Sequence, residues 1–418
     1  MTGRAALGLS PLRESPDFRR LWVGQGLSQI GGQLTVFAVA LQMYRLTGSS
    51  AAVGGLGLAV AVPNILFAVL GGSLGDAVDR RRLVLVTSSL QAGVSALFAA
   101  QALAGLRSPA VLYALVVVQS LVGSVNAPAR RTFMARLLPR ERLAAGAALN
   151  TLALQLAAVL GPACAGLIVA LWGLRACYAL DAISFGAALY GVARLPAMPP
   201  APGAPRPGPA AIGEAFGFVR HRSEVAGAFL TDLSIGLVAS PTALLPALDA
   251  ERFGGRTGVL GLLTAAGAVG GVLGSASSGL AGRVQRPGRG ALVGCAVYGL
   301  AVAGLGLAHS LWLALVLLAL AGAADTAAVV FHSTVVQLVT PDQLRGRISA
   351  LEYVVGMGGS QLGRFRAGAI GTLTGTTAAI TGGGLAAVGA AALVGAALPA
   401  FTRYRVNGPA DARPAPVG

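Results

Sequence analysis

The chain has 418 residues, of which 55% are hydrophobic and only 11% carry a charged side chain. Soluble domains carry about 25% charged residues, so this composition excludes a single water-facing globular surface. A membrane-spanning helix uses about 20 residues, so roughly twelve spans would take about 240 residues and leave the rest for loops and tails. The sequence therefore predicts an all-α polytopic membrane protein.

Several chemistries are excluded by residue types that the sequence lacks. All 31 basic residues are arginine, and the absence of lysine excludes both a Gly-Lys-Ser/Thr phosphate-binding loop and a Schiff-base lysine. The three histidines do not form an HExxH zinc motif. The three cysteines lie far apart in apolar stretches: Cys164, Cys177 and Cys295. We expect no enzyme, no cofactor and no metal site.

Apolar stretches of about 20 residues recur along the whole chain. They cover residues 21–44, 51–75, 83–105, 110–129, 145–171, 176–195, 225–248, 257–281, 291–308, 311–336, 348–371 and 377–401. Twelve spans place both ends of the chain on the same side of a membrane. On that side the tails and connections hold 24 arginines, against five on the other side.

This asymmetry explains the net charge of +16. Positively charged loops stay in the cytoplasm, so both ends are predicted to be cytoplasmic, in the inner membrane of a bacterium. The arginine excess sets topology, and we expect no nucleic-acid partner.

A proline-rich segment divides the spans six and six. Residues 196–209 contain seven of the 22 prolines, which is incompatible with a helix and predicts an extended linker. The residues from Gly213 to Glu224 suggest a short interfacial helix. The predicted domains are an N-terminal six-helix bundle (1–195), a linker with this helix (196–224), a C-terminal six-helix bundle (225–405) and a disordered tail (406–418).

The two halves also resemble each other. Pro139–Leu143 follows the fourth span and Thr340–Leu344 follows the tenth, and the acids Glu141 and Asp342 open the next helix in each case. A duplicated six-helix unit is typical of secondary transporters with a site near the membrane midplane. Coincidence between two short polar loops is the alternative.

The loop between the second and third spans resembles a signature of the major facilitator superfamily. The stretch from Gly72 to Arg82 is similar to the pattern G-x-L-x-D-R-x-G-R-R/K. Four positions match: Gly72, Asp76, Arg80 and Arg81. Ala77 and Asp79 depart from the pattern. The matching charges predict a latch between helices, and a purely topogenic charge run is the alternative.

A second motif concerns the direction of transport. In the fifth span Gly161, Pro162 and Gly166 resemble the G-P-x-x-G-G motif of exporters in the superfamily, with Ala165 as a departure. Proline bends a helix, and small residues allow close helix contact. The overall pattern resembles the enterobactin-exporter and macrolide-efflux branch. The stretches that carry this likeness are 17–22, 79–82, 138–150, 340–341 and 346–348.

Ionisable residues at membrane depth are costly, and they usually face a cavity or a partner. Asp325 lies near the middle of the tenth span, and His332 lies seven residues later on the same helical face, about 10 Å away. Asp232 lies within the seventh span. The resemblance implies that the first, fourth, seventh and tenth spans line the central cavity. We predict proton coupling by Asp325, Asp232 and His332, and structural hydrogen bonding is the alternative.

Neutral polar residues in the spans are candidates for cargo contact. They are Gln29 and Gln33 in the first span and Gln119 and Asn126 in the fourth. Their amides could line a cavity or equally bond neighbouring helices. Arg364 and Arg366 in the eleventh span depart from the usually uncharged family pattern.

Together these features predict a major facilitator fold of twelve transmembrane helices in two pseudo-symmetric bundles. The expected activity is proton-coupled export of a small organic molecule, such as a siderophore, an antibiotic or another drug-like compound, by alternating access. The expected partners are the cargo, protons and the lipid bilayer, and the expected state is a monomer. The alternatives are a proton-coupled importer or facilitator and a non-transporting membrane sensor.

Overall fold

The computed structural model describes residues 10–198, 209–276 and 284–406, without the side chains of 67–77, 131, 209–212, 214, 215 and 276. These residues form helices and connecting loops, with no strand among them. The first half contains α3 (Pro16–Thr47), α4 (Ser50–Ala77), α5 (Arg80–Leu103), α6 (Pro109–Arg131), α8 (Leu143–Trp172) and α9 (Leu174–Ala193). The second half contains α11 (Ser223–Leu233), α12 (Leu245–Arg252), α13 (Thr257–Ala276), α15 (Pro287–Leu307), α16 (Leu311–Val339), α17 (Asp342–Thr374) and α18 (Thr376–Ala397).

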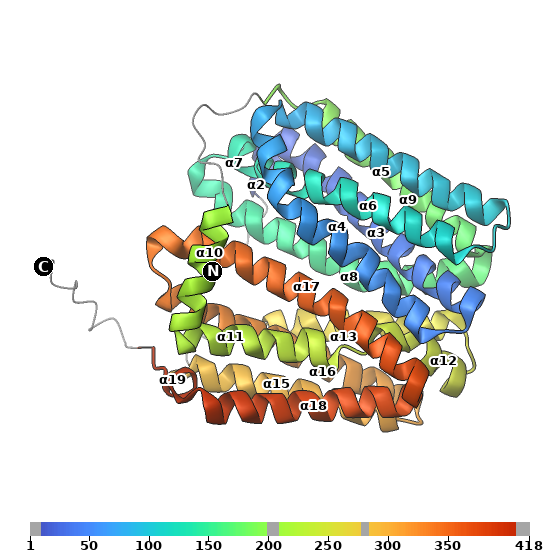
Figure 1. Ribbon diagram of the computed structural model, residues 1–418. Helices are drawn as coiled ribbons and strands as arrows, with labels where there is room; N and C mark the ends of the chain where they lie inside the picture. The colour runs from blue at the N-terminus through green and yellow to red at the C-terminus, as the bar shows by residue number, and fades with distance from the viewer. Residues whose placement is uncertain (1–9, 199–208, 277–283, 407–418) are drawn as a thin grey trace, which may run out of the picture.

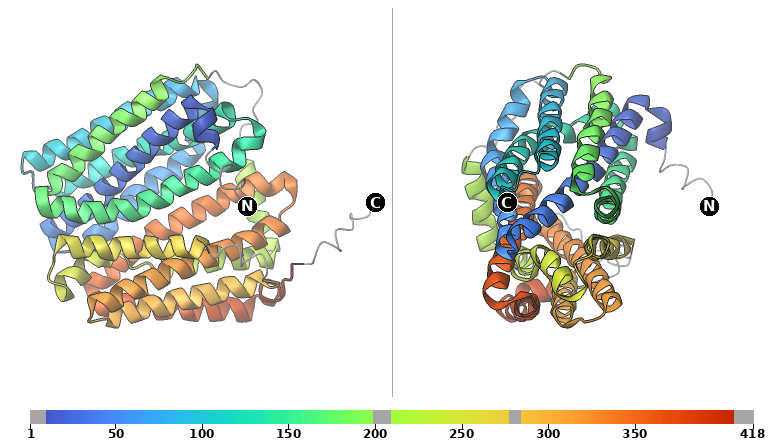
Figure 2. Two further views of the ribbon diagram at one scale, coloured as in Figure 1. Left: turned by 180° about the vertical axis from the view of Figure 1, so that it is seen from behind. Right: turned by 90° about the vertical axis from the view of Figure 1, so that its right-hand side faces the viewer.

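Shorter helices lie at the ends and connections of these two bundles. They are α2 (Ser10–Glu14), α7 (Phe133–Leu137), η1 (Arg140–Arg142), α10 (Pro209–His221) and α19 (Pro399–Arg403). Figure 1 shows α2, α7, α10 and α19 at one end of the molecule, which we call the linker end. The opposite end is called the loop end. Figure 2 shows the two halves as separate bundles when viewed from the loop end.

The predicted all-α membrane fold is confirmed. Nine helices of the described ranges are long and apolar enough to cross a membrane. Three further helices, α3, α4 and α17, are 32, 28 and 33 residues long, which is consistent with the predicted twelve spans when α11 and α12 are counted as one span. The glutamines of α3 and the charged residues of α17 lower the apolarity of these two helices.

Local sequence signals set the helix boundaries. The Ser15 and Ser49 hydroxyls cap α3 and α4 by accepting hydrogen bonds from the N–H groups of Phe18 and Ala52. α3 ends at Gly48, whose φ of 60° is a left-handed conformation that favours glycine. Because only two residues separate α3 from α4, the first two spans form an antiparallel pair.

The seventh span differs from the single continuous helix that the sequence predicts. α11 is followed by a π-helical segment (Ser234–Ala239), a 3₁₀ turn (Thr242–Leu244) and then α12. Pro241 has no N–H to donate and interrupts the α-helical hydrogen bonding here. A π-helical segment widens the turn and is frequent at functional sites.

A short helix follows the proline-rich segment. α10 begins at Pro209, which the sequence predicts as the last residue of the extended linker, and ends at His221, whereas the suggested helix runs from Gly213 to Glu224. Proline at the first position of a helix loses no hydrogen bond, because the N–H there has no intrahelical partner. The prolines from Pro199 to Pro207 and the tail from Asn407 lie outside the described residues.

The two halves meet along two helix pairs, α4 with α17 and α8 with α13. Glycines make the first contact close: a Cβ atom at Gly54 would lie 2.6 Å from the carbonyl oxygen of Arg364, and Gly368 lies against the carbonyl of Ser50. Figure 1 shows α4 and α17 approaching at the loop end and diverging toward the linker end.

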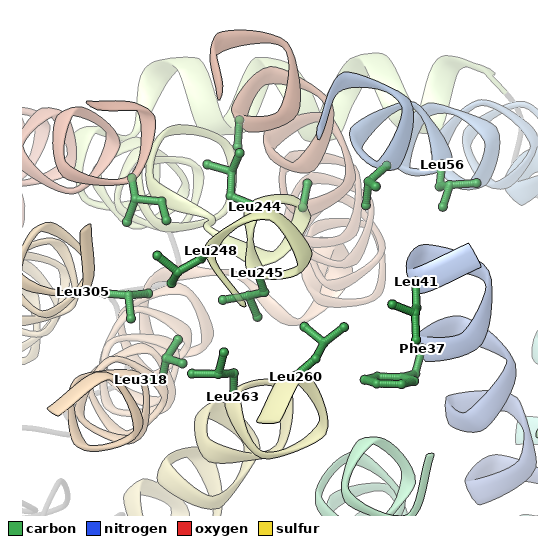
Figure 3. Packing of buried hydrophobic residues seen from close by; sticks show 14 of the residues in the cluster. Phe37, Leu41, Leu56, Leu244, Leu245, Leu248, Leu260, Leu263, Leu305 and Leu318 are labelled. Carbon is green, nitrogen blue, oxygen red and sulfur yellow. The ribbon is translucent and has the colours of Figure 1, made fainter. Parts of the chain in front are cut away.

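A hydrophobic cluster closes the loop end across both halves. Figure 3 shows its members from α3, α4, the seventh span and α13: Phe37, Leu41, Leu56, Leu244, Leu245 and Leu260. All six are buried. We call this cluster the loop-end seal, because its buried apolar side chains offer no hydrogen-bonding groups that could hold water there. A hydrogen bond from Arg45 to the Thr257 hydroxyl (3.1 Å) also joins the halves at this end.

Candidate functional site

Four ionisable side chains lie on α11 and on the two helices that pack against it, α16 and α17. Asp232 lies on α11, Asp325 and His332 on α16, and Glu352 on α17. His332 lies beside Glu352, and Asp232 lies beside Gly356, which follows Glu352 by one turn of α17. We call the four residues Asp232, Asp325, His332 and Glu352 the acid cluster.

Glu352 links this cluster to α16. The Ser333 hydroxyl donates a hydrogen bond of 2.6 Å to Glu352 Oε1, and His332 Nε2 lies 3.7 Å from the same oxygen. His332 is buried, and its Nδ1 has no hydrogen-bond partner in the described part of the chain. The imidazole therefore has one nitrogen near a carboxylate and one nitrogen free to bind a proton or a water molecule.

A glycine allows α11 and α17 to approach each other at this cluster. A Cβ atom at Gly356 would lie 3.1 Å from Asp232 Oδ2, a distance that leaves little room for any other residue. Asp232, Asp325 and Glu352 are each partly exposed. No group of three or more His, Cys, Asp and Glu residues in the described ranges could hold a metal ion. The arrangement can take up, hold and pass on protons.

The four predicted cargo contacts lie in the N-terminal half and differ in their bonding. Gln29 and Gln119 each have a buried Oε1 with no hydrogen-bond partner among the described residues. Gln33 packs against Gly161 of α8. Asn126 is buried and donates to the hydroxyls of Thr87 and Ser88 on α5, at 2.7 and 3.0 Å. Asn126 thus bonds a neighbouring helix, whereas Gln29 and Gln119 keep an acceptor free.

The loop between α4 and α5 binds the end of α9. Arg81 donates to the carbonyl oxygens of Val192 (3.4 Å) and Ala193 (2.6 Å), and the Arg80 N–H donates to the carbonyl of Met198 (3.0 Å). α4 runs through Gly72 and Asp76, but their side chains lie outside the described residues. The predicted latch through Asp76 stays a prediction.

Asp79, which departs from the family pattern, fixes this loop. Its Oδ1 caps α5 by accepting the Arg82 N–H (2.9 Å), and its Oδ2 accepts the Met198 N–H (2.8 Å). Partial burial alone would raise the pKa of the Asp79 carboxyl. Hydrogen bonds from the N–H groups of Arg82, Met198 and Arg81, together with the charge of Arg82, lower it below its ordinary value. Asp79 therefore stays ionised and holds the start of the linker.

The motif typical of exporters lies at the second contact between the halves. A Cβ atom at Gly166 would lie 2.8 Å from the carbonyl oxygen of Thr257, and one at Gly261 would lie 2.8 Å from that of Pro162. Gly166 and Gly261 thus bring α8 and α13 into backbone contact near the loop end. Gly161 borders Gln33 on α3. All three motif residues, Gly161, Pro162 and Gly166, are buried in α8.

One buried acid was missed by the sequence reasoning. Asp181 on α9 is fully buried, and its Oδ2 accepts hydrogen bonds from the hydroxyls of Thr35 and Ser95, both at 2.7 Å. It joins α3, α5 and α9 within the N-terminal half. The sequence does contain an indication of this site, because Asp181 is an isolated carboxyl in the apolar stretch 176–195, as Asp325 is in 311–336. Glu352 is likewise an isolated carboxyl in the stretch 348–371, and the sequence alone assigns it no function.

The two arginines of α17 have different surroundings. Arg366 donates from Nε to the carbonyl oxygen of Leu237 in the π-helical segment, at 2.8 Å. Arg364 donates to Gln361 Oε1 (3.3 Å), and its buried Nε has no hydrogen-bond partner in the described ranges. Arg366 therefore satisfies an irregular backbone, and Arg364 lies where α17 meets α4.

Comparison with known proteins gives a family for the whole chain. The family model described as transmembrane secretion effector matches residues 6–414. The chain is similar to the enterobactin exporter EntS of Citrobacter koseri, with 28% identity over 390 residues that cover 92% of each chain. It is also similar to EntS of Shigella boydii, with 28% identity over 410 residues that cover 96% of this chain and 97% of that protein.

Solved structures show the same fold at low sequence identity. A nucleoside transporter, NupG, superimposes with a TM-score of 0.71 at 13% identity and covers 93% of this chain. A bacterial homologue of the iron transporter ferroportin, in an inward-facing state, also gives 0.71, at 16% identity and 93% coverage. These similarities concern the fold of the two bundles. The twelve-span architecture, the loop between α4 and α5 and the match over nearly the whole sequence agree: this chain is a polytopic membrane transporter of the transmembrane secretion effector family within the major facilitator superfamily.

Proposed function

We propose that this transporter exports a small organic molecule in exchange for protons by alternating access. The observation that carries the proposal is the acid cluster, in which His332 lies 3.7 Å from Glu352 and Asp232 lies beside Gly356, one turn of α17 away from Glu352. Like charges in a poorly solvated site are costly, so such a group favours partial protonation. When the exposure of the cluster to water changes during transport, the cluster would bind or release a proton.

The contacts between the halves support alternating access. The loop-end seal and the glycine contacts of α4 with α17 close one end, while α4 and α17 diverge at the other. The arginine distribution supports a linker end that faces the cytoplasm of a bacterium. An exporter takes its cargo from the cytoplasm, so we place the entry for cargo at the linker end. Transport would rock residues 1–195 against 225–405.

The cargo proposal rests on the relatives and on two amides. The similar proteins are named as enterobactin exporters, so a catecholate siderophore is the first cargo to test, followed by other drug-like compounds. The free acceptor oxygens of Gln29 and Gln119 would suit a cargo rich in hydroxyl donors. A buried acceptor without a partner is destabilising, and a hydrogen bond from the cargo would remove that cost.

The test uses everted membrane vesicles that contain the full chain and hold an acidic interior. A pH-sensitive acridine dye reports the gradient while enterobactin, a linear catecholate or erythromycin is added. Exchange of cargo for protons should release the dye quench, with no release in vesicles lacking the chain. Uptake of a compound without any change in the gradient would indicate a facilitator, and loss of a preloaded compound driven by the gradient would indicate an importer. Either result would contradict the proposal.

A further inference from the structure

A groove runs along the outer surface between α15 and α16. It has a volume of about 510 Å³, and its walls are apolar except for Arg286 and Arg289 at the linker end. Gly290 and Gly294 on α15 also line the groove and pack closely against Phe331 and Ala328 of α16. Val293 and Leu320 on its walls are 62% and 46% exposed, so the groove faces outward, where lipid surrounds a membrane protein.

The length of the groove corresponds to one leaflet of a bilayer. Its lining extends from Arg286, directly before α15, to Val297, which is twelve residues and about 16 Å along the helix axis. The hydrocarbon core of a bilayer is about 30 Å thick, so each leaflet contributes about half of that depth. The two arginines lie at the start of α15, and the end of a membrane-spanning helix is where the bilayer surface is expected.

Positive charge is concentrated at this end of the groove. The neighbouring charges of Arg289 and Arg405 lower the pKa of the Arg286 guanidinium below its ordinary value, because each of them repels the positive charge of Arg286. A hydrogen bond from the Val406 N–H to the Gln285 carbonyl (3.1 Å) keeps the end of the chain beside the start of α15. No carboxylate among the described residues forms an ion pair with any of the three. An anion would relieve this repulsion.

We propose that this groove binds an anionic phospholipid, whose phosphate lies between Arg286 and Arg289 and whose acyl chain lies along the groove between α15 and α16. The apolar walls select a lipid over a soluble phosphate compound, and the paired guanidinium groups select an anionic headgroup over a zwitterionic one. The α16 wall belongs to the helix that carries Asp325 and His332. The occupant therefore packs against the helix of the acid cluster.

Native mass spectrometry of the purified full chain tests this site. Dioleoyl phosphatidylglycerol, dioleoyl phosphatidylcholine and glycerol 1-phosphate are titrated separately. We expect phosphatidylglycerol to remain bound. The double variant Arg286→Gln/Arg289→Gln should weaken its binding by roughly tenfold or more, because arginines near a membrane surface each contribute to the attraction of anionic lipids. The control Arg107→Gln/Arg175→Gln at the loop end should bind as the wild type does.

A groove-filling variant tests the acyl-chain contact separately. Ala327→Trp keeps all the arginines and should still reduce phosphatidylglycerol binding, and Val297→Trp provides a second filled groove should the first variant fold poorly. Unchanged binding in Arg286→Gln/Arg289→Gln, or equal binding of phosphatidylcholine, would overturn the headgroup assignment. Equal binding of glycerol 1-phosphate would show a phosphate site without a lipid and would overturn the proposal as well.

Discussion

The Arg366 guanidinium donates a hydrogen bond from Nε to the carbonyl oxygen of Leu237, 2.8 Å away, and joins α17 to the π-helical segment of the seventh span. An irregular helix leaves carbonyl groups without intrahelical partners, and inside a membrane water cannot replace them. Arg366, a charged residue where the family usually has none, therefore supplies the missing hydrogen-bond partner of the irregular π-helical segment.

Replacing Arg366 with methionine keeps much of the length of the side chain but removes the donor. The Leu237 carbonyl would then lose its partner, and the free energy of unfolding should fall by on the order of 1–3 kcal/mol. Equilibrium unfolding in detergent measures this loss. Arg107→Met, at an exposed loop position, is the matched control and should leave the stability unchanged. A stability of Arg366→Met equal to that of the control would contradict the assigned role.

A methyl group at Gly166 should push the two halves apart at the loop end. Its Cβ would meet backbone atoms of Thr257 and Gly261 at 2.8 and 2.9 Å, and a backbone cannot move aside as a side chain can. Spin labels at residues 107 and 309, in a background without the three native cysteines, report the separation of the halves. Gly166→Ala should lengthen this distance by a few ångströms.

The control for this experiment is Gly26→Ala. A Cβ atom at Gly26 would have no neighbour within 4 Å, so the label distance should match that of the wild type. Equal distances in both variants would show that the contact between α8 and α13 does not hold the loop end closed.

Asp79→Ala should release the start of the linker from α5. The variant loses the N-cap of α5 and the acceptor of the Met198 N–H, and loss of such a cap costs about 0.5–2 kcal/mol. Amide hydrogen exchange at Met198 and in the first turn of α5 should become faster. Asp342→Ala, which removes an exposed acid at the start of α17, should not change exchange at these positions.

The same contact has a predictable pH dependence. Because the pKa of Asp79 is lowered in the folded protein, its contribution to stability is present at neutral pH and is lost as the pH falls below the ordinary value of 3.8. Exchange protection of Met198 that decreases at higher pH, between 5 and 8, would contradict this account.

Asp181 should act on stability and not on coupling. Asp181→Ala leaves the Thr35 and Ser95 hydroxyls without their acceptor in the buried interior of the N-terminal half, at a cost on the order of 1–3 kcal/mol. Transport per folded molecule should keep the wild-type ratio of uphill to downhill flux. A changed ratio would place Asp181 among the coupling residues.

Much of the fold could be predicted from the sequence because spanning helices are continuous apolar stretches. Those stretches coincide with the observed helices, and the duplication of Glu141 and Asp342 indicates the two halves. The seventh span could not be predicted in detail, since its irregular form depends on a hydrogen bond to Arg366, 129 residues away from Leu237. Apolar periodicity contains no information about such a partner.

The candidate site shows the same limit. The cost of ionisable groups at membrane depth identifies Asp232, Asp325 and His332 as candidates, and their role in coupling stays a prediction. Glu352 contacts His332 and Ser333 because of the way α17 packs against α16. The sequence alone does not contain that packing. The role of Asp79 could not be predicted for a different reason. A departure from a family pattern does not show which backbone N–H groups will donate to the new carboxylate, here those of Arg82 and Met198.

The central claim is that Asp325 carries the coupling proton, and one measurement tests it most directly. Proteoliposomes with purified wild-type chain, Asp325→Asn or the control Asp342→Asn are compared, with the compound from the vesicle panel that the wild type exports. Uphill transport is driven by an imposed pH gradient, and downhill exchange is measured without one. Asp325→Asn should lose uphill transport and its proton flux while keeping at least part of the downhill exchange, and Asp342→Asn should retain both. Undiminished uphill transport and proton flux in Asp325→Asn would contradict the claim.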